Sequence, residues 1–225
     1  MDDRDVIKVL VELWKEERAS PLEYVVWYGS RANDADLDLL ILCSAPIHWQ
    51  NSAYGRLDVL CMTWTEFTER VGLLDPIAID PLMEGQIISG DAQRWEALKT
   101  RRSDTPPEAT AISYLLSRSS EQCVSSLSLL DTYRQTSQSV HLLWSLVNLG
   151  YVFSYWLLAG LYKHSEWKGP VTVHELLQLD ASQDFADLWA AIRRAKRKPE
   201  ALAEAEVVSF YQRWEDVSLQ QPHLG

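Results

Sequence analysis

The first hundred residues consist of short apolar runs separated by turn-forming residues, a pattern typical of a β-sheet with intervening helices. Four apolar runs are predicted as strands, at residues 23–28, 36–42, 56–62 and 86–89. The Asn, Ser and Gly of residues 51–55 predict a turn before the third strand. Residues 75–85, which contain two prolines, are predicted as loop and short helix.

Apolar residues at helical spacing predict the helices of the chain. In the first hundred residues these are 2–18, 65–71 and 92–99, and Thr65 is predicted to cap the second. In the second half they are 108–133, 139–163, 172–179, 183–196 and 199–216. A strand over 171–173 stays open as an alternative, because all three residues there are β-branched.

The charged, proline-containing segment 101–107 separates the two patterns and is the best candidate for a domain boundary. We therefore predict an α+β chain with two domains. Residues 1–103 form a mixed β-sheet domain with flanking helices, and residues 104–225 form an all-α helical bundle.

Residues 142–162 are an apolar segment of 21 residues without a formal charge, long enough to cross a bilayer. Polar side chains lie in its middle, among them Ser145, Asn148 and Ser154, and no basic cluster flanks either end. These features favour the buried central helix of a bundle, and a membrane span is the alternative.

The composition is that of a folded globular protein, with 47% hydrophobic and 24% charged residues in 225. A formal charge of −11 makes long nucleic acid an unsuitable partner, because phosphate binding needs a basic surface. The three cysteines have no CxxC spacing, so neither a disulfide framework nor a zinc site is indicated. With a charged, amphipathic N-terminus, this predicts a cytoplasmic location.

Candidate chemistry lies between the first two predicted strands. The first strand leads into Gly29 and Ser30, where the missing Cβ of glycine lets the backbone approach a ligand and Ser30 offers a hydroxyl and an N–H to a phosphate oxygen. The second strand begins with Asp36 and Asp38, whose two-residue spacing places both carboxylates on one face. Two adjacent carboxylates repel unless a cation lies between them, and Mg²⁺ prefers carboxylates together with substrate phosphates.

A third carboxylate, Asp58, lies within the next apolar strand, where a charge is costly unless it has a partner. If the strands at 36–42 and 56–62 are neighbours, Asp58 can face the pair formed by Asp36 and Asp38. Three converging carboxylates beside a Gly-Ser turn would form a two-metal site for phosphoryl transfer.

This combination resembles the nucleotidyltransferase superfamily, whose fold is shared with DNA polymerase beta. The resemblance covers residues 22–62 and implies roles for the matching positions. Gly29 and Ser30 would bind the nucleoside triphosphate, and Arg31 is a further candidate for phosphate contact. Asp36 and Asp38 would be metal ligands, and Asp58 would be the third acid, as a ligand or as the general base. Only five residues separate Ser30 from Asp36, fewer than is usual in the superfamily.

A nucleotidyltransferase domain followed by helices is similar to the aminoglycoside nucleotidyltransferases, and also to minimal nucleotidyltransferases encoded with helical toxin partners. The resemblance implies an enzyme that uses Mg²⁺ and transfers a nucleoside monophosphate, AMP from ATP or its equivalent from another nucleoside triphosphate, to a hydroxyl of a small molecule or protein. The alternative is a degenerate domain that acts as an antitoxin or protein-interaction module, which the short connection before Asp36 favours. The abundant aromatic residues are compatible with a homodimer surface.

Other candidate residues in the second half have ordinary structural interpretations. Glu108 and Glu121 could serve as a base, but solvated helix charges are the favoured interpretation. The histidines at 141, 164 and 174 have no close metal-ligand spacing. The basic run 193–198 ends a predicted helix, where cations complement the helix dipole. The aromatic series 144–162 is interpreted as bundle core or dimer surface rather than as a platform for bases.

Overall fold

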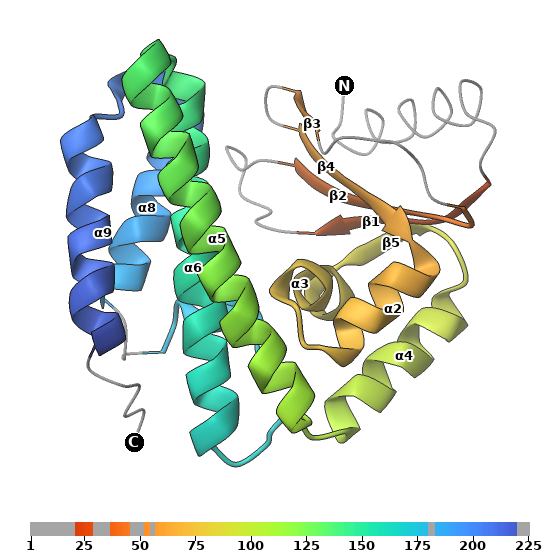
Figure 1. Cartoon of the computed structure of the whole chain (residues 1–225). Coiled ribbons are helices and arrows are strands. Elements are labelled where there is room, and N and C mark those ends of the chain that lie inside the picture. Colours follow the sequence, from red (N-terminus) through yellow and green to blue (C-terminus); the bar gives the residue numbers. More distant parts are fainter. Residues whose placement is uncertain (1–20, 29–36, 46–51, 55–56, 180–182, 220–225) are drawn as a thin grey trace. The chain divides into compact units, whose positions relative to one another are not determined.

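The computed structural model describes residues 21–28, 37–45, 52–54, 57–179 and 183–219 (Figure 1). The predicted helix at 2–18 therefore lies outside the described residues. The chain divides into two compact units, residues 1–105 and 106–225. The first unit contains the sheet and its helices, and the second is helical, so the predicted α+β class with a mixed sheet followed by helices is confirmed.

Within the described residues, the sheet of the first unit has five strands in the order β3-β4-β2-β1-β5 (Figure 1). The strands are β1 Leu22–Tyr28, β2 Leu37–Cys43, β3 Ser52–Tyr54, β4 Leu57–Thr63 and β5 Gln86–Ser89. The two strands β2 and β4 pair in parallel, and every other pair is antiparallel. This confirms all four predicted strands to within a residue or two at each end.

The predicted turn at 51–55 is wrong for its central residues, because Ser52–Tyr54 forms strand β3. This strand pairs antiparallel with β4, and Tyr54 lies opposite Leu57. A three-residue edge strand is stabilised by its ladder hydrogen bonds to the neighbouring strand. Its three residues, Ser-Ala-Tyr, show no alternating apolar pattern, so the sequence indicated only the turn residues around them.

In the described part of the first unit, three helices cover one face of this sheet: α2 Trp64–Gly72, α3 Pro76–Glu84 and α4 Ala92–Asp104 (Figure 1). The α2 cap was predicted wrongly, since Thr63 and not Thr65 accepts the hydrogen bond from the Glu66 amide, at 3.0 Å. The last residue of β4 is thus also the cap of the next helix, which leaves no loop between the two. The nine-residue helix α3 fills most of the segment predicted as loop and short helix, and Pro81 lies inside it.

The two faces of the sheet bury different side chains. On the helix-covered face, Tyr24 of β1 stacks on Trp64 of α2, with ring centroids 4.8 Å apart. Phe67 stacks on Trp95 of α4 at 5.2 Å, so these four rings form one aromatic cluster. The opposite face carries a mainly aliphatic cluster: Val25, Leu39, Ile41, Cys43 and Val59.

The predicted linker 101–107 is shorter than expected, because α4 continues to Asp104. Arg102 is the reason for the difference. Its side chain is only 8% exposed, and its guanidinium donates hydrogen bonds to the Gly72 and Thr105 carbonyls. An arginine can bury its aliphatic stem in this way while its terminal nitrogens donate to backbone carbonyls, so the charge at this position did not mean that the segment is an exposed loop.

The second unit is a set of helices around two long antiparallel ones, α5 Ala109–Thr136 and α6 Ser139–His164 (Figure 1). The remaining elements are α7 Val173–Leu176, α8 Gln183–Arg197, the 3-10 turn η1 Pro199–Ala201 and α9 Glu204–Leu219. The predicted helix at 199–216 was therefore wrong in its first residues, where Pro199 begins the 3-10 turn. The alternative strand at 171–173 is also wrong, because Thr172 is the cap of α7.

Helix α6 is the core of the second unit and contains the apolar segment 142–162. Ser145 in its middle donates a hydrogen bond to the Ser126 carbonyl of α5 at 2.9 Å, and Ser126 also contacts the Tyr211 hydroxyl of α9. Ser154 donates within α6, to the Gly150 carbonyl at 2.9 Å. Among the described residues, α6 alone is long and apolar enough to cross a bilayer, and 72% of its most apolar window is buried. A core helix of a soluble protein meets the same criterion.

Candidate functional site

Three polar side chains lie side by side at one end of the helix-covered sheet face. Tyr28 of β1 is opposite Asp38 of β2, and Asp38 is opposite Asp58 of β4. Residues opposite one another on neighbouring strands project to the same face, about 4.8 Å apart between strands. We call these residues the polar row, and all three side chains are half-buried.

The next positions on the same face are apolar, which distinguishes the polar row from the rest of the sheet. Val26 lies opposite Leu40, and Leu40 lies opposite Leu60. One step further along the strands are Tyr24, Leu42 and Met62. The polar row therefore borders a packed apolar surface, and it lies at the end of β1 from which the chain continues to Gly29 and Ser30.

The condition for bringing the acids together is met for Asp38 and Asp58, because β2 and β4 are parallel neighbours in matching register. Two carboxylates at this spacing supply hard oxygen donors to a divalent cation, and Mg²⁺ is commonly bound by one or two carboxylates plus phosphate oxygens. The donor set thus fits Mg²⁺ bound together with a nucleotide. Among the described residues, no group of three or more acids, histidines or cysteines converges on one point.

The other predicted site residues lie outside the described residues. These are Gly29, Ser30, Arg31 and Asp36. Their assignment as nucleotide-binding and metal-binding residues stays a prediction. In the sequence they directly flank the polar row, since Gly29 follows Tyr28 and Asp36 precedes Asp38 by two residues.

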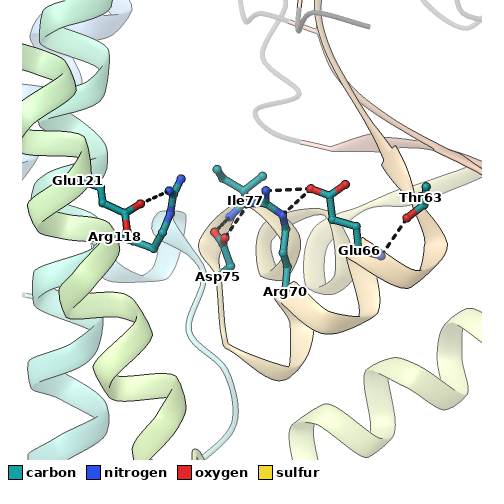
Figure 2. A network of polar contacts seen from close by, with 7 residues as sticks. All are labelled: Thr63, Glu66, Arg70, Asp75, Ile77, Arg118 and Glu121. Carbon is teal, nitrogen blue, oxygen red and sulfur yellow. Dashed lines mark hydrogen bonds and ion pairs between the residues drawn. The ribbon is translucent and has the colours of Figure 1, made fainter. Parts of the chain in front are cut away.

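Asp75, the most deeply buried acid among the described residues of the first unit, was not singled out by the sequence pattern. Its side chain is 0% exposed and caps α3 by accepting a hydrogen bond from the Ile77 amide at 3.1 Å. Arg70 of α2 pairs with the same carboxylate at 3.0 Å and with Glu66 at 2.9 Å (Figure 2). Asp75 therefore joins α2 to α3, which is a structural role. The Asp-Pro sequence at 75–76 was the available signal, since proline is common in the first helical turn.

The candidate acids of the second unit lie on the surface of α5. Glu108 is the exposed residue before the helix. Glu121 accepts a hydrogen bond from Arg118 (Figure 2) and another from Ser117. The hydrogen bond from Arg118 is the main reason why the pKa of Glu121 lies below its usual value. A carboxyl with a lowered pKa is a weaker base, which disfavours Glu121 as a proton acceptor.

The remaining candidates of the second unit have structural partners. Asn148 donates a hydrogen bond to Ser125 at 3.0 Å, and Arg194 of the basic run pairs with Glu206 of α9. Tyr155 is fully buried, whereas Trp144 is 39% exposed. The aromatic series therefore contributes mainly to the bundle core.

Comparisons with known proteins give no family assignment. No family model and no curated protein matches the chain. Among solved structures, the chain is similar to the crystal structure of a nucleotidyltransferase-like protein from Exiguobacterium sibiricum 255-15. The two are 13% identical, with 93% of this chain and 74% of that chain covered, and the TM-score is 0.38. A TM-score of this size is too low to establish a shared fold or function.

Proposed function

We propose that the chain is a metal-dependent nucleotidyltransferase that transfers a nucleoside monophosphate, AMP from ATP, to a hydroxyl of a small molecule or a protein. The observation that supports this most strongly is the register pairing of Asp38 with Asp58 on two parallel strands. The Gly29-Ser30 sequence directly after β1 supplies the second support, because such a turn suits a phosphate group.

In the proposed reaction the acceptor oxygen forms a bond to the α-phosphorus of ATP. The bond from that phosphorus to the oxygen bridging to the β-phosphate breaks, and pyrophosphate leaves. Asp36 and Asp38 would hold Mg²⁺, and Asp58 would either complete the metal ligands or take the proton of the acceptor hydroxyl. Bound Mg²⁺ would neutralise charge on the phosphates. Gly29, Ser30 and Arg31 would hold the triphosphate.

The alternative function is a degenerate domain that binds a protein partner, such as an antitoxin. The feature that favours it is the five-residue connection from Ser30 to Asp36, which leaves little chain to surround a triphosphate. In this alternative the acids would remain without a catalytic role. The second unit would then supply the contact surface.

Calorimetry with ATP distinguishes the two functions. An enzyme is expected to bind ATP in the presence of Mg²⁺ and to lose this binding when EDTA is added, whereas the absence of binding would favour the interaction module. Transfer is then tested with ATP labelled at the α-phosphate, aminoglycosides and a mixture of proteins as acceptors. Asp36→Asn should abolish label transfer, and transfer that survives this change would contradict the metal assignment.

A further inference from the structure

Tyr28 is a member of the polar row that the metal assignment does not use. It is the last residue of β1, lies opposite Asp38, and is half-buried. Asp38 in turn lies opposite Asp58, so Tyr28 flanks the pair of carboxylates on the β1 side. The strand β5 pairs with β1 at positions 25–27. In the described part of the sheet, Tyr28 therefore lies one residue past the end of the β1–β5 pairing.

Another tyrosine of the same strand shows what a structural tyrosine does here. Tyr24 projects from the same face, is 1% exposed, and stacks on Trp64. Its hydroxyl donates a hydrogen bond to the Asp91 carbonyl at 3.2 Å. Tyr24 thus fills the aromatic cluster under the helices, and its hydroxyl is committed to the backbone before α4. Tyr28, four residues later on the same face, lies opposite Asp38.

A tyrosine side chain reaches further from the sheet than an aspartate at the neighbouring position. The Tyr28 ring can therefore lie beside the carboxylates. Its hydroxyl can then reach a ligand that the carboxylates bind through a cation. At neutral pH a phenol is a hydrogen-bond donor, and the phosphate oxygens of a bound nucleotide are charged acceptors.

We propose that Tyr28 is a positioning residue whose hydroxyl donates a hydrogen bond to a phosphate oxygen of the nucleotide bound at Asp38 and Asp58. This inference rests on the proposed function. It assigns to β1 a direct part in nucleotide binding, in addition to the Gly-Ser turn that follows it in the sequence. Tyr28 would orient the phosphates and would not take part in proton transfer.

The test compares Tyr28→Phe with the matched control Tyr24→Phe by calorimetry. Each variant loses one hydroxyl from the same strand and the same face, and thermal unfolding checks that each is folded. The ligands are Mg·ATP, Mg²⁺ with inorganic tripolyphosphate, and Mn²⁺ alone. We expect Tyr28→Phe to weaken binding of both phosphate ligands about tenfold, the usual effect of losing a hydrogen bond to a charged group. Its affinity for Mn²⁺ alone should stay within about twofold of wild type, and Tyr24→Phe should not change any of the three affinities.

The other outcomes overturn the inference in distinguishable ways. Unchanged affinity of Tyr28→Phe for Mg·ATP and tripolyphosphate would show that the hydroxyl does not contact phosphate. An equal loss for Mn²⁺ alone would show that Tyr28 acts on the carboxylates and not on the nucleotide. If wild type binds Mg·ATP and only the Tyr28 result fails, the proposed function stands without this inference. If wild type binds no Mg·ATP, both are overturned.

Discussion

Two acidic regions of the first unit differ in how their charges are accommodated. Asp75 is fully buried at the junction of α2 and α3, where Arg70 and the Ile77 amide bind its carboxylate. Asp38 and Asp58 are half-buried in neighbouring strands, and each has the other carboxylate in register beside it. In the first region an arginine pairs with the acid, and in the second the strand register places two acids next to each other.

The charge of the neighbouring group therefore distinguishes a structural acid from a candidate functional acid better than the exposed fraction of the side chain does. A buried carboxylate with a cation and a backbone donor stabilises the fold that surrounds it, and removing it leaves a buried charge uncompensated. Like charges opposite one another in a sheet are instead destabilising. A cation bound from solution would offset this repulsion, which makes Asp38 and Asp58 candidates for function.

The largest expected effect follows from replacing either acid of the polar row. Asp38→Asn and Asp58→Asn should each reduce label transfer from ATP by at least about a thousandfold, which is about 4 kcal/mol of barrier. The free energy of unfolding should stay within about 1 kcal/mol of wild type, because each change also removes a like-charge repulsion. Transfer assays and urea titrations on the same preparations measure both quantities. A large loss of stability with intact transfer would place these acids with Asp75.

The reverse result is expected for Asp75→Ala. Removing this fully buried carboxylate should lower the free energy of unfolding by about 3–5 kcal/mol, because Arg70 keeps only Glu66 as an ion-pair partner and α3 loses its cap. The control is Asp91→Ala, which removes an exposed cap of α4 and should cost only about 0.5–2 kcal/mol. Urea unfolding of both variants tests this. Equal losses would show that burial and the ion pair add nothing to the cap at Asp75.

A smaller effect is expected from Cys43, which lies on β2 with Asp38 but faces the aliphatic cluster. Burial, with a smaller contribution from the charge of Glu23, raises the pKa of the Cys43 thiol from 9.0 to about 11. Between these pH values the unfolded thiol loses its proton while the folded one keeps it. The free energy of unfolding should therefore fall as pH rises through this window, by about 2–3 kcal/mol in all. The Cys43→Ala variant should lack the part of this decrease that comes from the thiol. The same decrease in wild type and variant would show that the Cys43 thiol does not cause it.

The smallest effects are expected for a pair of glycines. A Cβ at Gly150 of α6 would lie 2.6 Å from Cδ1 of Ile192 in α8, so Gly150→Ala should cost about 1–3 kcal/mol of stability through overpacking. A Cβ at Gly72 of α2 would meet nothing within 4 Å, so Gly72→Ala should gain about 0.4–1 kcal/mol. Thermal unfolding of the two variants measures the difference. A stabilised Gly150→Ala variant would show that the Ile192 side chain moves aside without cost.

The sequence predicted the central strands well, because β1, β2 and β4 are apolar runs bounded by turn residues. It could not predict β3, whose pairing with β4 comes from a neighbour and not from its own pattern. The cap of α2 was misplaced by two residues because Thr63 belongs to both a strand and a helix boundary. Both errors have the same cause, because each feature depends on a neighbouring element and not on the residues of the element itself.

For the candidate site too, the sequence predicted the local spacing of the residues but not which strands lie next to each other. The Asp-x-Asp spacing indicated a pair, but whether Asp58 joins it depends on the strand order, which the structure supplies for Asp38 and Asp58. Tyr28 could not be assigned to the same row before the register of β1 and β2 was known. Asp75 was missed because its partner Arg70 comes from another helix, and no local pattern encodes that ion pair.

The measurement that tests the central claim most directly is Mn²⁺ binding followed by electron paramagnetic resonance. Wild type, Asp38→Asn and Asp58→Asn are titrated with Mn²⁺, and Asp91→Asn serves as an exposed acid of the same unit. If the two strand carboxylates hold one cation together, both single changes weaken binding at least about tenfold, and Asp91→Asn binds as wild type does. If either strand variant retains wild-type affinity, Asp38 and Asp58 do not share a metal site and the proposed chemistry is wrong.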